Sequence, residues 1–162
     1  MAGIDQLVRL YDLPPLSGAV EPLRGRGIRL RRPRAYEKVP VLAWVARHFD
    51  SGWMGECDVT FSRQPVSTYI ATHQGQLVGF ICYDTTYRGF LGPLGVAETH
   101  RRQGIGVGLL LQGLHAMAEA GYAYAILGHA SEHVAFYRKW VGAIDIPGSE
   151  TGIYTDKLQE PA

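Results

Sequence analysis

The amino-acid sequence predicts a mixed α/β fold, α+β-like in character, with a central sheet of about seven strands and about four helices. Two observations carry this prediction. Strand-like and helix-like segments are interspersed, but without the regular strand–helix alternation of a doubly wound fold. One apolar segment, residues 90–96, leads through a charged turn into a glycine-rich helix start, which indicates a strand followed directly by a helix.

Size and composition are those of one folded domain. The 162 residues are enough to bury a core. The chain is 46% hydrophobic and 19% charged, which excludes a disordered protein. We expect residues 1–23, which contain Pro14, Pro15 and Pro22, to form an N-terminal arm that lies across a single domain at residues 24–162.

Charge and cysteine content limit the environment and the partners. The net charge of +1 gives no reason to expect a nucleic-acid or membrane partner. Cys57 and Cys82 lie in apolar surroundings without metal-like spacing, as expected of buried free thiols. No signal peptide and no apolar run of about 18 residues is evident, so we expect a cytoplasmic protein.

The first half of the expected domain begins with a strand at residues 27–32, where Ile28 and Leu30 alternate with arginines. A helix then runs to about residue 49, provided that Pro40 sits near its first turn. Its predicted inner stripe consists of Val39, Leu42, Ala43, Ala46 and Phe49. Residues 52–63 predict a short helix, and residues 67–73 and 77–84 predict an antiparallel hairpin.

The second half begins with the strand at residues 90–96. Pro93 cannot donate to a ladder, so a bulge is expected there. A helix follows over residues 105–120, with an inner stripe of Leu110, Leu114, Met117 and Ala118. The remaining predicted elements are a strand at 122–128, a helix at 132–141 capped by Ser131 and ended by Gly142, and strands at 143–146 and 153–156.

The glycine-rich helix start predicts an anion site. Gly104, Gly106 and Gly108 lack Cβ atoms, so a ligand can approach the main-chain N–H groups closely. A helix N-terminus carries about four unpaired N–H groups and roughly half a positive charge. Arg101 and Arg102 add positive charge, and the turn therefore suits a phosphate group.

These motifs resemble a known family. The strand Leu94-Gly95-Val96, the spacing Arg101-x-x-Gly104-x-Gly106, and the later Phe136-Tyr137-Arg138-Lys139 before Gly142-Ala143 are similar to those of the GNAT superfamily of acyl-CoA-dependent N-acetyltransferases. The resemblance covers about residues 24–158. It implies a mostly antiparallel sheet with a splayed strand pair at the cofactor site.

The resemblance also implies acetyl-CoA as cosubstrate, with no metal. Main-chain N–H groups of residues 103–108 would bind the pyrophosphate of coenzyme A, and Leu94 and Val96 would pair with the pantetheine arm as if it were a strand. The implied cofactor-binding residues are Leu94, Gly95, Val96, Arg101, Arg102, Gln103, Gly104, Ile105, Gly106, Val107 and Gly108.

Tyr137 matches the tyrosine that would protonate the leaving thiolate, although a tyrosine on an amphipathic helix is more commonly a packing residue. An amine acceptor also needs a base, because a lysine-type amine with a pKa near 10.4 is almost fully protonated at neutral pH. Asp84 and Glu56 are the preferred catalytic carboxylates. Glu98, His129 and Glu132 are further candidates, and for each the alternative is an ordinary surface side chain.

The predicted activity is transfer of an acetyl group from acetyl-CoA directly to a primary amine of a small molecule or peptide. The alternative is an acyl-CoA-binding sensor or interaction module without turnover. Aromatic and apolar residues in the 50–66 region favour a partly apolar acceptor, and an open edge at residues 153–156 would allow a homodimer.

Two other motif matches are weaker. His129-Ala130-Ser131-Glu132-His133 matches an inverted zinc-peptidase pattern, but His129 would precede the helix and no third ligand is evident. The triple glycine lacks the spacing of a dinucleotide-binding loop.

Overall fold

The computed structural model describes residues 3–159. A sheet of seven strands has the order β2-β3-β4-β5-β6-β1-β7. Its strands are β1 (Gln6–Arg9), β2 (Ile28–Arg31), β3 (Thr68–His73), β4 (Gln76–Tyr83), β5 (Phe90–Val96), β6 (Tyr124–Leu127) and β7 (Ile144–Asp145). All neighbours pair antiparallel except β5 and β6, which are parallel. The predicted mixed, mostly antiparallel fold is therefore confirmed.

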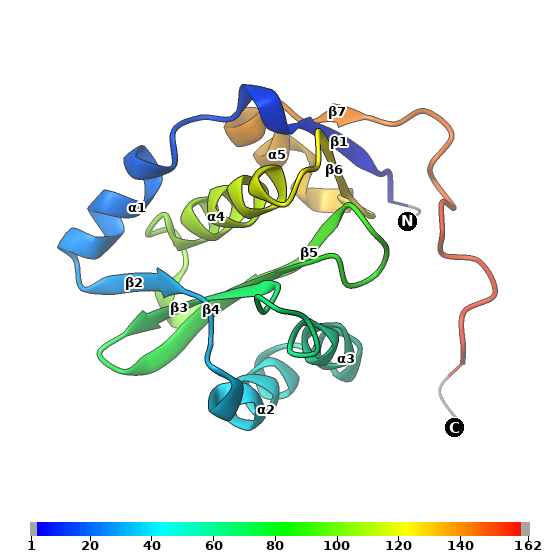
Figure 1. The fold of residues 1–162 in the computed structure, drawn as a ribbon. Helices are drawn as coiled ribbons and strands as arrows, with labels where there is room; N and C mark the ends of the chain where they lie inside the picture. The colour runs from blue at the N-terminus through cyan, green and yellow to red at the C-terminus, as the bar shows by residue number, and fades with distance from the viewer. Residues whose placement is uncertain (1–2, 160–162) are drawn as a thin grey trace.

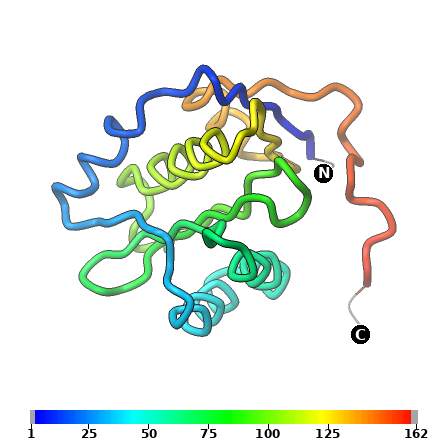
Figure 2. The backbone as a smooth tube through the Cα atoms, in the orientation of Figure 1, coloured from blue at the N-terminus to red at the C-terminus, as the bar shows by residue number. Residues whose placement is uncertain are grey.

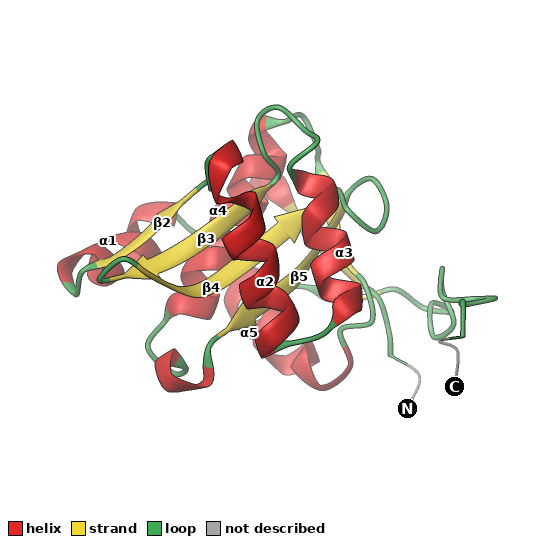
Figure 3. Ribbon diagram, turned by 90° about the horizontal axis from the view of Figure 1, so that it is seen from below, coloured by secondary structure: helices red, strands yellow, loops and turns green. Residues whose placement is uncertain are grey.

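Helices cover both faces of the sheet (Figure 1). The α-helices are α1 (Leu16–Gly25), α2 (Lys38–His48), α3 (Ser51–Thr60), α4 (Ile105–Glu119) and α5 (Val134–Val141). Short 3-10 turns occur at Leu10–Asp12, Ala35–Glu37, Glu98–His100 and Ser131–His133. Figure 3 shows α2 and α3 together on one face, with α1 and α4 behind the strands.

Two apolar clusters hold these layers together. The larger joins α4, through Leu109, Leu110 and Leu114, to the sheet and to α1. The smaller lies under α2 and α3, around Trp44 and the fully buried Phe80. β4 supplies both clusters, which explains why its residues from Val78 onward form an almost unbroken apolar run rather than an alternating one.

The N-terminal segment differs from its prediction. Residues 6–9 form β1, which lies between β6 and β7 inside the sheet, and α1 packs on α4. Figure 2 shows this first part of the chain running along the same layer as α4. The expectation of an arm over residues 1–23 is therefore wrong for its described part, because β1 belongs to the sheet.

Three further corrections concern local structure. The inner stripe of α2 is Val41, Trp44 and Val45, while Val39 is exposed to 74%. Ser131 has a φ of +45° and does not cap α5. Residues 153–156 form no strand, and a turn with a Tyr154 N–H to Thr151 carbonyl bond takes their place. The predicted route to a homodimer through that edge is thereby removed.

The local predictions around β5 hold. Its register on β4 shifts between the pairs Ile81↔Leu94 and Tyr83↔Leu91, which places the extra residue at 92–93 as expected for a bulge. β5 pairs with β6 only at Phe90↔Ile126 and Leu91↔Leu127. The two strands then separate, which is the predicted splay.

Cys57 and Cys82 are free and buried, as predicted. Within residues 3–159, none of the helices has the length and apolar character needed to cross a bilayer.

The corner after β2 depends on one ion pair. Arg31 donates from both terminal nitrogens to Glu37, at 2.8 and 2.7 Å, and the Arg34 main-chain N–H donates to the same carboxylate. These contacts, led by the Arg31 hydrogen bond, lower the pKa of Glu37 from 4.5 to about 2. Its stabilisation is therefore complete above about pH 4.5 and is lost as the pH falls towards 2.

We predict that Glu37→Gln lowers the free energy of unfolding by about 1–2 kcal/mol at neutral pH. The difference from the wild type should shrink between about pH 5 and pH 2, because the wild-type carboxylate is itself protonated there. Urea unfolding over this pH range measures it. Glu21→Gln, an exposed change on α1, is the matched control, and a difference that does not depend on pH would contradict the ion-pair account.

Candidate active site

Two cavities meet where β5 separates from β6. The larger, of about 680 Å³, lies along residues 94–96 and the start of α4. The smaller, of about 310 Å³, lies between the end of β6, α3 and the loop that follows β4. Four residues line both cavities: Trp53, Leu94, His133 and Tyr137. Ligands in the two cavities would therefore meet at the side chain of Tyr137.

Gly104 and Gly106, at the start of α4, line one side of the larger cavity, which we call the glycine floor. Gly104 begins α4 with a φ of +84°, a conformation that favours glycine. A Cβ on Gly106 would have only the ends of Phe136 and Val96 near it, both at 3.9 Å, so the side of α4 facing the cavity is open. Arg101 and Arg102 line the same cavity. The arrangement combines exposed helix-start N–H groups with positive charge, as an anion requires.

Most of the predicted cofactor residues lie together here. Those that line the larger cavity are Leu94, Gly95, Val96, Arg101, Arg102, Gly104, Ile105, Gly106 and Val107. Gln103 and Gly108 do not line it. The Gln103 carbonyl accepts a hydrogen bond from Arg26, and Gly108 leaves room for Leu23, whose Cδ1 would lie 2.6 Å from a Cβ. Gln103 therefore contacts the residue that follows α1, and Gly108 allows α4 to pack closely on α1.

Gly95 has a packing role that its motif does not reveal. A Cβ there would overlap the ring of Phe49, at distances down to 2.4 Å. Phe49 in turn stacks on Trp53, with ring centroids 4.8 Å apart. Gly95 thus lets two aromatic rings from the α2–α3 layer reach the larger cavity.

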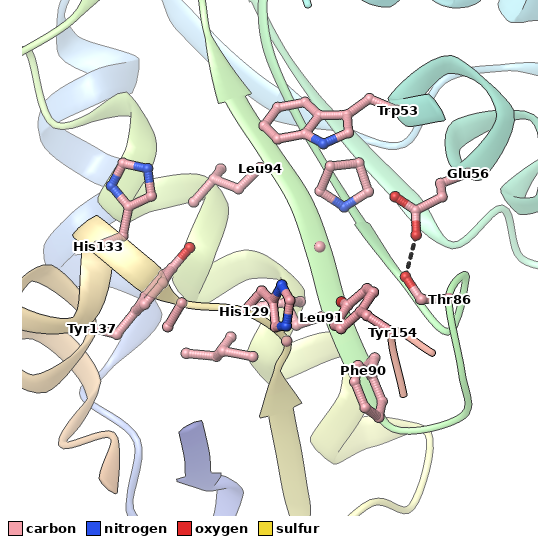
Figure 4. Close-up of a pocket in the computed structure, with 15 residues that line it drawn as sticks. Trp53, Glu56, Thr86, Phe90, Leu91, Leu94, His129, His133, Tyr137 and Tyr154 are labelled. Atoms are coloured by element: carbon pink, nitrogen blue, oxygen red, sulfur yellow. Dashed lines mark hydrogen bonds between the residues drawn. The ribbon is translucent and has the colours of Figure 1, made fainter. Parts of the chain in front are cut away.

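The smaller cavity holds one predicted base. Glu56, on α3, accepts a hydrogen bond from Thr86, which lies in the loop between β4 and β5 (Figure 4). Burial raises the pKa of Glu56, while the Thr86 hydrogen bond partly opposes this shift. A carboxylate with a raised pKa in a cavity can accept a proton at near-neutral pH.

Tyr137 stands across the cavity from Glu56 and comes from α5 (Figure 4). Burial raises the pKa of its hydroxyl, so the phenol holds its proton at neutral pH. Tyr137 lines both cavities, and its role in protonating a leaving thiolate stays a prediction.

The smaller cavity also contains residues that the sequence did not mark as a set. The ring of Tyr154 lies 3.9 Å from the ring of His129, centroid to centroid. His129 Nε2 is buried and has no hydrogen-bond partner among the described residues. His129 was one candidate base, but Tyr154 lies in a segment expected to be a strand, and nothing in its local pattern indicates a site.

The other carboxylates lie elsewhere. Asp84 lines neither cavity: its Oδ1 accepts from the Gly89 N–H at 2.8 Å and its Oδ2 from the Tyr122 hydroxyl at 3.0 Å. The choice of Asp84 as a catalytic carboxylate is therefore corrected, because its side chain closes a loop outside both cavities. Glu98 is exposed and lines neither cavity. Glu132 is exposed at the rim of the larger one.

His129 precedes the helical turn that carries His133, as expected. Within residues 3–159, no three His, Cys, Asp or Glu side chains come together as a metal-binding group.

We predict that substitutions of the two preferred carboxylates affect stability to different extents. Asp84→Asn should lower the free energy of unfolding by about 1–3 kcal/mol, because it disturbs two hydrogen bonds that close the loop after β4. Glu56→Gln should stay within about 0.5 kcal/mol of the wild type, because burial already penalises the Glu56 carboxylate. Denaturant unfolding compares them, and equal losses would contradict the different roles.

Known protein structures share the fold described above. The structure is similar to a glucosamine N-acetyltransferase region of a fungal multi-domain β-N-acetylglucosaminidase, with a TM-score of 0.73 and 15% identity over 89% of this chain and 20% of that one. It is also similar to a GCN5-related N-acetyltransferase from Sphaerobacter thermophilus, with a TM-score of 0.64 and 20% identity over 88% of this chain and 48% of that one. A third similar structure is a GCN5-related N-acetyltransferase from Kribbella flavida, with a TM-score of 0.60 and 18% identity over 90% of this chain and 55% of that one.

The chain thus spans between 20% and 55% of the lengths of these three proteins, and the likeness concerns the fold. No curated protein sequence matches the chain. The model of the acetyltransferase (GNAT) family matches residues 33–143, which is more than half of the chain. With the splayed strand pair and the glycine floor, this match shows that the chain belongs to the GNAT acetyltransferase family.

Proposed function

We propose that this protein transfers an acetyl group from acetyl-CoA directly to the nitrogen of a primary amine. The observation that carries the proposal is the meeting of the two cavities at Tyr137, with Glu56 on the side away from the glycine floor. The larger cavity would hold coenzyme A and the smaller one the amine. Family membership supports the use of an acyl-CoA.

The residues of the larger cavity fit coenzyme A. The open face at Gly106 and the charges of Arg101 and Arg102 suit its pyrophosphate. Beyond Leu91, the main chain of β5 has no partner in β6 and is free to pair with the amide-bearing pantetheine arm. When bound, acetyl-CoA would supply an activated thioester acyl group and a thiol leaving group.

The chain's own groups would manage the protons. Glu56 accepts a proton from the acceptor ammonium, which makes the nitrogen nucleophilic. Tyr137 holds a proton at its hydroxyl oxygen, on the side where a departing thiolate needs one. The two groups stand on opposite sides of the junction, so that Glu56 can serve the amine while Tyr137 serves the thiolate (Figure 4).

The alternative, an acyl-CoA-binding module without turnover, needs the larger cavity but neither Glu56 nor Tyr137. Free-thiol release from acetyl-CoA, with and without a panel of amines, separates the two functions. We expect release that depends on an amine. Tight binding of coenzyme A without release for any acceptor would favour the sensor. The cytoplasmic location and a homodimer stay predictions.

We predict that Gly106→Val weakens binding of coenzyme A at least about tenfold, a loss of roughly 1.4 kcal/mol, because the side chain fills the face that the pyrophosphate must approach. The fold should tolerate the change, since the nearest atoms to a Cβ are at 3.9 Å. Calorimetric titration measures the affinity. Gly18→Val, at a position on α1 with no atom within 4 Å of a Cβ, is the matched control. An unchanged affinity in Gly106→Val would contradict pyrophosphate binding at the glycine floor.

We predict that Glu56→Gln lowers kcat/KM by about 10²–10⁴-fold at neutral pH. In the wild type, activity should fall as the pH drops through the raised pKa of Glu56, because the base becomes protonated. Thr86→Val removes the hydrogen bond that lowers this pKa, so the acidic limb should move to higher pH. Profiles of kcat/KM against pH measure both effects, and a limb that stays in place in Thr86→Val would exclude Glu56 as the base.

A further inference from the structure

The smaller cavity has an unusual balance of charge. Among the described residues that line it, Glu56 is the one carboxylate, and none is a lysine or an arginine. The wall is rich in aromatic rings, which come from Trp53, Phe90, Tyr137 and Tyr154. Such a wall attracts an ammonium group through the negative faces of the rings and through the carboxylate.

The C-terminal segment closes one side of this cavity. Ser149 is buried, and its hydroxyl accepts from the Asp5 N–H at 2.9 Å. Asp5 Oδ1 in turn accepts from the His129 N–H at 2.8 Å. The Tyr154 hydroxyl packs against Gly128, where a Cβ would come within 2.6 Å of it. These contacts hold Tyr154 against the floor of the cavity rather than in solvent (Figure 4).

We propose that the smaller cavity selects a compact amine with an apolar or aromatic body and no acid group, and that the ring of Tyr154 binds this body. The inference rests on the proposed function and deepens it. An acceptor carboxylate would lose its water in a cavity that offers no lysine or arginine from the described chain, and it would meet Glu56 as a like charge.

Size supports the same class. The cavity holds about 310 Å³, at the lower end of the range for small-molecule sites.

The test uses matched pairs that differ by one carboxylate: 2-phenylethylamine against phenylalanine, and tyramine against tyrosine. Thiol release from acetyl-CoA gives kcat/KM for each. We expect each amine to exceed its amino acid by at least about 100-fold, because an unpaired buried charge is costly. Equal values, or a preference for the amino acids, would overturn the proposed class while leaving acetyl transfer intact.

Binding separates this inference from the proposed function. Calorimetric titration of each pair into protein saturated with coenzyme A requires no turnover. If no acceptor releases thiol but the amines still bind at least tenfold more tightly than the amino acids, acetyl transfer fails and the selectivity stands. If no member of either pair binds, or both members bind equally, the inference fails.

Substitutions of Tyr154 test its role in binding the acceptor. Tyr154→Ala should raise KM for 2-phenylethylamine at least tenfold with a small change in kcat and in the affinity for coenzyme A. Tyr154→Phe should restore most of the loss, because it keeps the ring. Tyr36→Ala removes an aromatic ring that is 78% exposed and lines neither cavity, and it should behave as the wild type. Wild-type KM in Tyr154→Ala would overturn the role of Tyr154.

Discussion

The parting of β5 from β6 is the constraint on which the rest of the site depends. The strands share two residue pairs and then diverge, and the extra residue at 92–93 bends β5 at the point of divergence. Continuous pairing along β5 would occupy the main-chain groups that face β6 and would leave no junction between the two cavities. The packing of Leu91 in the larger apolar cluster fixes where the shared part ends. An interrupted ladder thus creates both halves of the site.

The parts of this arrangement that were predictable are those encoded by neighbours in the sequence. β3, β4 and α4 follow from hairpin and helical periodicity, and Pro93 marks the bulge because it lacks a donor. The glycine turn predicts an anion site because helix geometry fixes where its N–H groups point. Even there, the motif does not say which glycines serve the ligand: Gly106 faces the cavity, while Gly95 and Gly108 make room for Phe49 and Leu23.

The missed features depend on contacts between distant segments. β1 has a polar residue, Gln6, that is fully buried and donates to Asp145, so its pattern does not resemble a core strand. Asp84 ends a predicted strand, but its φ of +58° and its two hydrogen bonds turn the carboxylate away from the cavity. Tyr154 reaches the site only because Ser149 is tied to Asp5 across the chain. No local pattern reports such a tie.

The tie between Asp5 and Ser149 also joins two segments that lie outside the part of the chain matched by the family model. The glycine floor, Glu56 and Tyr137 lie inside the span 33–143 that matches the family, whereas Asp5, Ser149 and Tyr154 lie outside it. Substitutions in the two outlying segments would therefore alter the wall of the smaller cavity without changing any residue inside the matched span. One wall of the smaller cavity is thus modular: the two chain segments that hold it meet at the main-chain N–H of Asp5, while the Asp5 carboxylate binds the main chain of His129.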